Sequence, residues 1–158
     1  MSDSIAIKLK LTKDFFSEET STCLFKIMEY ACKKHIGVTI PVLNRHEYVG
    51  ASDEAILFVH HSLVILNAEP LIGSDMDFEV KELRPYPLLN RLKLLAKLFE
   101  FIFKQNNILS MKVLFTSGDI SFEGKVLHVE IEDIPEYLEE SINKAQWPSF
   151  YYQFYWKK

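Results

Sequence analysis

The longest apolar pattern in the chain lies in residues 88–106, LLNRLKLLAKLFEFIFKQN. At helical spacing its apolar side chains form one broad stripe and a second one beside it, which together cover most of the circumference. The polar wedge that remains is narrow and holds Asn90, Lys93, Lys97, Glu100 and Lys104. A surface helix needs a single apolar face, so we predict that this helix lies against a sheet and contacts a second partner as well.

A second helix is predicted for residues 17–35. Ser17 is a suitable N-cap, acids follow in the first turn, and apolar residues recur at helical spacing up to Ala31. Gly37 is expected to take the left-handed position after this helix. A short third helix is predicted to begin at Asp133, with Glu136 completing a capping-box pattern, and to end before Pro148.

Alternating apolar and polar residues predict the strands. The clearest alternation is found in residues 5–11, 73–83, 111–115, 126–131 and 150–156. Residues 38–43 carry Pro41, which favours an edge strand or an irregular one. Residues 55–66 fit either two short strands or one buried helix, and their β-branched residues favour the strands.

The order of these elements is β-α-β-β-β-β-α-β-β-α-β, without a long linker or an internal repeat. Regular βαβ alternation is absent, and this favours an antiparallel sheet. We therefore predict one α+β domain over residues 1–158, in which two long helices and one short helix pack on a mainly antiparallel sheet.

Composition and charge narrow the class of protein. The chain is 48% hydrophobic and 25% charged, as expected for a globular domain, and its net charge of −4 argues against a polyanion binder, so no direct nucleic-acid partner is expected. Its N-terminus does not resemble a secretory signal, and its most apolar segment is interrupted by His60 and His61. A cytoplasmic protein without a membrane partner, with Cys23 and Cys32 as reduced thiols, is expected.

The sequence contains no catalytic signature. The five histidines do not follow a metal-ligand spacing: His46-Glu47 lacks the second histidine of a zincin motif, because Gly50 stands there. The acids of residues 75–79 lack the glycine and the bidentate glutamate of a calcium loop. We therefore predict no catalytic residues, no metal site, no cofactor and no enzymatic activity.

Acidic residues are concentrated between residues 119 and 140. This segment has eight acids and one base, Lys125, which gives it a local charge of −7. A solvated surface would explain these acids, because surface carboxylates are ordinary. The alternative hypothesis is an acidic patch that covers a basic partner and speeds the encounter with it.

The chain ends in a run of large aromatics. Strand alternation places Phe150, Tyr152, Phe154 and Trp156 on one face and Tyr151, Gln153 and Tyr155 on the other. If the first face packs on the core, the second presents tyrosines, which are favoured interface anchors because they are apolar along the ring and can hydrogen-bond at the tip. A strand that is buried on both faces is the alternative.

The acidic EIEDIPEYLEE segment, the aromatic FYYQFYW end and the absence of a catalytic motif resemble bacterial toxin-immunity proteins, including those of contact-dependent growth inhibition systems. This resemblance implies a cognate toxin as the partner, commonly a nuclease, whose active or substrate-binding surface the inhibitor covers. Charge and expected exposure point to these binding residues: Glu130, Glu132, Asp133, Glu136, Glu139, Glu140, Tyr151 and Tyr155.

Two other functions fit the same sequence, and a third, nucleic-acid binding through Lys93, Lys97 and Lys104 with the aromatic tail, is disfavoured by the net charge. A secretion chaperone is also small, acidic and α+β, and it would be expected to form dimers that expose apolar grooves. An enzyme without a recognisable motif would need a pocket in which His60 or His61 meets a carboxylate.

Overall fold

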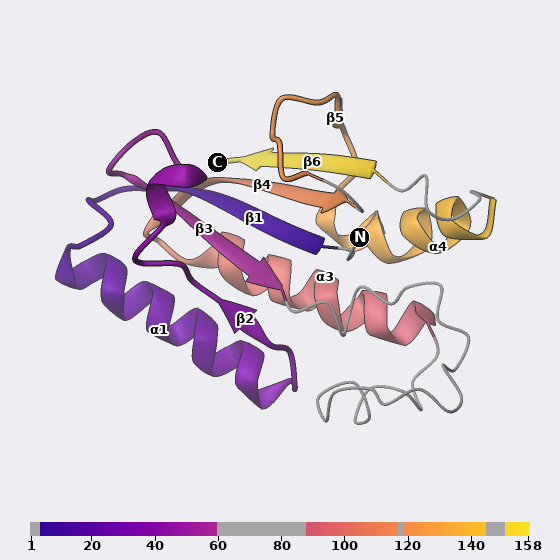
Figure 1. Cartoon of the computed structure of the whole chain (residues 1–158). Coiled ribbons are helices and arrows are strands. Elements are labelled where there is room, and N and C mark those ends of the chain that lie inside the picture. Colours follow the sequence, from indigo (N-terminus) through magenta and orange to yellow (C-terminus); the bar gives the residue numbers. More distant parts are fainter. Residues whose placement is uncertain (1–3, 60–87, 117–118, 145–150) are drawn as a thin grey trace, which may run out of the picture.

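A single sheet organises the computed structural model, which describes residues 4–59, 88–116, 119–144 and 151–158 (Figure 1). Its six strands lie in the order β2-β3-β1-β4-β6-β5. In chain order the strands are β1 (Ser4–Leu11), β2 (Val38–Thr39), β3 (Glu54–Val59), β4 (Ile108–Thr116), β5 (Val126–Leu127) and β6 (Tyr151–Lys157). The helices are α1 (Glu18–Lys33), α3 (Leu88–Lys104) and α4 (Ile134–Lys144), with short 3-10 turns η1 (Arg45–Glu47) and η3 (Ile131–Asp133).

The pairing within this sheet is antiparallel at every neighbouring pair except β5 and β6, which run parallel. The longest strands, β1 and β4, lie side by side at its centre, and a register shift between Lys10 and Leu11 loosens their pairing at one end. The predicted α+β class and the mainly antiparallel sheet are confirmed. The strand predicted for residues 38–43 lies at the edge of the sheet as β2, but it is shorter than predicted because it ends at Thr39, before Pro41.

The helices pack on one face of the sheet. The main core joins inward side chains of β1, β3, β4 and β6 to α1, α3 and α4, and its centre holds the fully buried rings of Phe99, Phe115 and Phe154. Helix α3 contacts β4, α1 and α4, so the prediction of a helix between the sheet and other helices is confirmed. Its exterior also follows the predicted wedge, because Asn90, Lys93, Lys97 and Lys104 are exposed.

Helix α1 shows how local sequence sets the element ends. Ser17 is the N-cap as predicted, and its hydroxyl accepts from the Thr20 N–H at 3.2 Å. At the other end the prediction for Gly37 is wrong, because His35 takes the left-handed position with φ 59°. The His35 and Ile36 N–H groups donate to the carbonyls of Cys32 and Ala31, and burial of Ile36 holds this Schellman-type end in place.

The opposite face of the sheet carries a smaller apolar cluster. Ala6, Ile56 and Leu114 point to this side from three neighbouring strands, and Val49 covers them from the loop after η1. Four partly buried residues complete the cluster: Tyr48, Phe58, Ile120 and Phe122. Two loop segments of the described chain, the one after η1 and the one that carries Ile120 and Phe122, therefore cover this face, whereas helices cover the other face.

Some predicted elements differ from the structure or lie outside the described residues. The strand predicted for residues 126–131 is wrong in length, because β5 ends at Leu127 and Ile131 belongs to η3. The Val129 carbonyl accepts from the indole N–H of Trp156 at 2.9 Å and not from a strand partner. The predictions for residues 60–66 and 73–83, and for a helix stop at Pro148, fall on residues that the structure leaves undescribed. No helix among the described residues is long and apolar enough to cross a membrane.

Candidate partner-binding surface

The predicted acids follow one another from the N-cap of η3 through α4, and we call them the acidic ridge: Glu130, Glu132, Asp133, Glu136, Glu139 and Glu140. Burial of Ile134, Pro135 and Leu138 against the helix side of the sheet fixes the start of α4. Because the buried residues occupy one side of η3 and α4, the acids between them are turned outward. Glu136, Glu139 and Glu140 share one helix face through their spacing of three and four residues.

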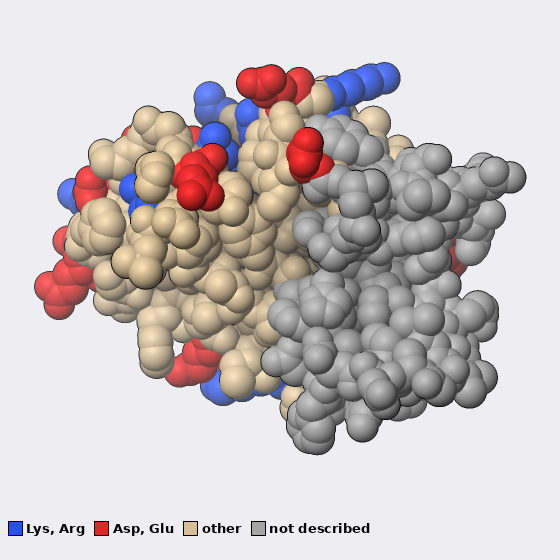
Figure 2. All heavy atoms as spheres, viewed as in Figure 1, with Lys and Arg blue, Asp and Glu red and all other residues tan. Residues whose placement is uncertain are grey.

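The ridge is accessible, and its residues are all acidic. Glu139 is half-buried, and the other five acids are exposed. The ion pairs between described side chains join Lys8 to Glu54, Lys10 to Asp53 and Lys33 to Glu29, and none involves Glu130, Glu132 or Glu136. On the side seen in Figure 2, uncharged side chains cover most of the described surface, and a few acidic and basic side chains stand among them and at the edge.

A cleft borders the ridge. Its volume is about 340 Å³, and it lies between the end of α3, η3 and the end of β6. Three carboxylates and one lysine line it together with three large apolar side chains: Glu100, Glu130, Glu132, Lys104, Phe103, Ile131 and Trp156. An apolar floor with surplus negative charge suits the long aliphatic stem and the cationic head of a lysine or arginine.

Contacts to both aromatic rings, Trp156 and Phe103, hold the floor of the cleft in place. The indole N–H of Trp156 donates to the Val129 carbonyl at 2.9 Å, and its ring stacks against Phe154 with the centroids 6.0 Å apart. The Lys158 ammonium lies 5.4 Å from the ring centroid of Phe103 and donates to the Gln105 carbonyl at 2.7 Å. Partial burial lowers the pKa of Lys158. The floor is thus preformed in the free protein.

The structure does not bring the predicted tyrosine Tyr155 to the ridge. Phe154 and Trp156 face the helices as predicted, so alternation turns Tyr155 to the opposite side of the sheet, where it pairs in register with Lys112. The side chain of Tyr151 lies outside what the structure describes. The large aromatics near the acids are instead Phe103 and Trp156, and their place in the cleft depends on the packing of α3 beside β6, which strand alternation alone cannot show.

The histidines and cysteines are the other candidate chemical groups. His35, His46 and His128 are exposed, and His60 and His61 lie outside the described residues. No group of three metal-ligating side chains occurs in the described part of the chain. Cys23 is buried and Cys32 exposed, both as free thiols, and burial raises the pKa of the Cys23 thiol.

Sequence reasoning missed the role of Arg45. From η1 its guanidinium donates to the Ala51 carbonyl at 3.3 Å and to the Glu54 carbonyl, and it lies 4.2 Å from the ring centroid of Phe15. The three partners come from the loop before β3, from β3 itself and from the segment before α1. Arg45 therefore holds η1, the start of β3 and the segment before α1 together. The sequence gives no sign of this role, because two of its three partners are backbone carbonyls and none follows a periodic pattern.

Comparison with known proteins yields no relative: no family model, no curated protein and no solved structure matches this chain.

Proposed function

We propose that this protein binds a cognate bacterial toxin, such as a nuclease, and neutralises it by covering its active or substrate-binding surface. The observation that carries the proposal is the acidic ridge beside a preformed cleft whose floor is aromatic. A surface that acts on nucleic acid must be basic, because it has to bind phosphates. An inhibitor that presents ordered carboxylates competes for the same lysines and arginines.

The two parts of this surface have different tasks. The ridge acts at long range, since its field attracts a basic partner and raises the rate of encounter. The cleft acts at contact, because Trp156 and Phe103 offer apolar area around carboxylates that can hold one cationic side chain of the toxin. Inhibition requires only that the bound protein occupies the toxin surface, so the proposal needs no catalytic group in this chain.

The test uses the polypeptide encoded next to this gene, because an immunity gene is expected beside the gene of its toxin. Replacing Glu136, Glu139 and Glu140 together with lysine should slow association by about tenfold or more at low ionic strength and flatten its salt dependence. Replacing Glu130 and Glu132 with lysine should mainly speed dissociation, because these two side chains line the cleft. Surface plasmon resonance over a series of salt concentrations measures both rates.

The matched control replaces the exposed acids Glu19, Glu29 and Glu47 with lysine, which changes the net charge by the same amount at positions on α1 and η1. Circular dichroism establishes that each variant is folded. Equal slowing by the control triple would mean that only net charge matters. Unchanged binding in the ridge triple would show that this surface is not the toxin-binding site.

A further inference from the structure

A second charged surface lies on the side of the sheet opposite the helices. We call it the lysine face, and it comprises Lys8 and Lys10 of β1, Ser110 and Lys112 of β4, and Tyr155 and Lys157 of β6. The registers arrange these residues as two rows across three neighbouring strands. Lys8, Lys112 and Tyr155 are direct neighbours in one row, and Lys10, Ser110 and Lys157 in the next.

This arrangement brings like charges together. Lys8 and Lys112 are directly opposed across β1 and β4, a placement that disfavours the sheet. Acids compensate the face on one flank only: Lys8 pairs with Glu54 at 3.5 Å, and Lys10 pairs with Asp53 at 2.8 Å. The hydrogen bond between Lys10 and Asp53 raises the pKa of the lysine and lowers that of the carboxyl.

The other flank keeps its positive charge. Lys112 and Lys157 have no acidic partner among the described residues, and the Lys112 ammonium lies 5.5 Å from the ring centroid of Tyr155. The half-buried Tyr155 ring therefore lies beside Lys112 of its own row, and Lys157 stands in the next row. An aromatic ring among lysines on a sheet offers both a stacking surface and phosphate partners.

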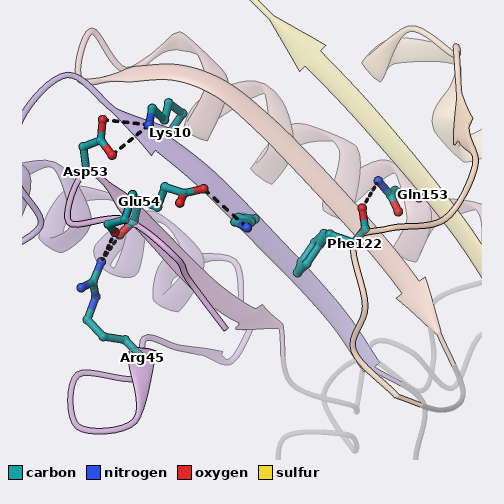
Figure 3. Close-up of polar contacts among 8 residues, drawn as sticks. Lys10, Arg45, Asp53, Glu54, Phe122 and Gln153 are labelled. Carbon is teal, nitrogen blue, oxygen red and sulfur yellow. Dashed lines mark hydrogen bonds and ion pairs between the residues drawn. The ribbon is translucent and has the colours of Figure 1, made fainter. Parts of the chain in front are cut away.

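The lysine face is hollowed where these side chains stand. The hollow has a volume of about 440 Å³, and Glu54 and Leu109 complete its lining. Figure 3 looks onto this side of the sheet, with the helices behind, and shows Lys10 and Asp53 turned toward each other and the loop of Phe122 crossing the strands. Gln153 donates to the Phe122 carbonyl at 3.1 Å, which fixes that loop as a wall beside the lysines.

We propose that the lysine face binds single-stranded nucleic acid, with backbone phosphates on Lys8, Lys112 and Lys157 and one base on the ring of Tyr155. The proposal is independent of toxin neutralisation. Phosphodiesters carry permanent negative charge and relieve the repulsion between Lys8 and Lys112. An acidic polypeptide would also supply charge, but its carboxylates have no flat apolar surface with which to occupy the space over Tyr155.

The net charge of −4 predicts no nucleic-acid partner, but the acids and the lysines lie on different sides of the sheet. The acidic ridge packs with η3 and α4 on the helix side of the sheet, whereas the lysines point to the other side. Salt screens charges beyond about 8 Å at physiological ionic strength, so a ligand on the lysine face responds mainly to the lysines.

The experiment measures the fluorescence anisotropy of a labelled oligouridylate of about ten nucleotides, a length within the range that one such platform covers. The Lys112→Gln/Lys157→Gln variant should bind about tenfold more weakly at low salt, and the slope of log affinity against log salt should fall by about 1.4 because two phosphate contacts are lost. The Tyr155→Leu variant should lose at least about fivefold in affinity with the slope unchanged, because stacking releases no counterions.

The matched control is Lys93→Gln/Lys97→Gln on the exposed side of α3, which removes the same charge. At about 0.15 M salt, where charges are screened beyond about 8 Å, it should leave affinity within about twofold. The proposal is overturned if the wild-type chain does not bind the oligonucleotide at low salt, or if the control loses as much affinity as the sheet variant. Poly-glutamate that binds as tightly, with no effect of Tyr155→Leu, would assign the face to an acidic protein.

Discussion

The two faces of the sheet use the same strands in different ways. On the helix face, alternate residues of β1, β3, β4 and β6 are apolar and meet three helices, so nearly all of their surface is buried. On the other face the middle of the sheet is apolar under two loops, while one end carries four lysines around a hollow. A strand thus supplies stability with one set of side chains and leaves the second set available for recognition.

This contrast predicts the largest loss of stability at the centre of the helix face. Phe99→Ala removes a fully buried ring that meets Phe115 edge-on with the centroids 6.3 Å apart, and it should lower the free energy of unfolding by about 3–5 kcal/mol. Urea denaturation followed by circular dichroism measures the change. The control Phe25→Ala removes a ring that is 67% exposed on α1 and should stay within about 0.5 kcal/mol of wild type. Similar losses for both rings would contradict a core located on this face.

A smaller loss is expected where loops cover the other face. Arg45→Ala removes the guanidinium contacts with the Ala51 and Glu54 carbonyls and with the Phe15 ring, and should destabilise by about 2 kcal/mol. Arg45→Lys should recover less than half of the lost stability, because an ammonium has no flat surface to stack on the Phe15 ring and no planar pair of donors for the two carbonyls. His46→Ala alters an exposed neighbour in η1 and should have little effect in the same denaturation experiment. A neutral Arg45→Ala would show that the loop is held by its apolar contacts alone.

The smallest effect has the opposite sign. Lys112→Gln removes one of the two opposed lysines of β1 and β4, and should raise the free energy of unfolding by about 0.2–1 kcal/mol at low salt. The gain should shrink as salt screens the repulsion. Thermal unfolding at two salt concentrations measures both effects, with Lys97→Gln on α3 as the control. A destabilised Lys112→Gln variant would mean that the lysine contributes more through its contact with the Tyr155 ring than it loses to repulsion.

Some of the candidate site could be predicted from the sequence. Acids at spacings of three and four residues, between buried apolar positions, had to share an outward face of the last helix, and Glu136, Glu139 and Glu140 are on α4. The cleft could not be predicted, because Phe103 and Trp156 belong to elements far apart in the chain and meet only when α3 packs beside β6. The lysine face was missed for the same reason: Lys8, Lys112 and Lys157 become neighbours only through strand register.

What the sequence determined by itself is local and periodic. The wide apolar stripe of residues 88–104, the Ser17 cap and the alternation in β1 and β6 follow from geometry that repeats every few residues, so they can be seen in a short window. The tertiary structure alone decided the strand order, the early end of β5 and the turn of Tyr155 away from the acids. The physical reason is that these outcomes depend on which apolar surfaces, far apart in the chain, become buried against each other. A short segment of sequence does not determine which of them pack together.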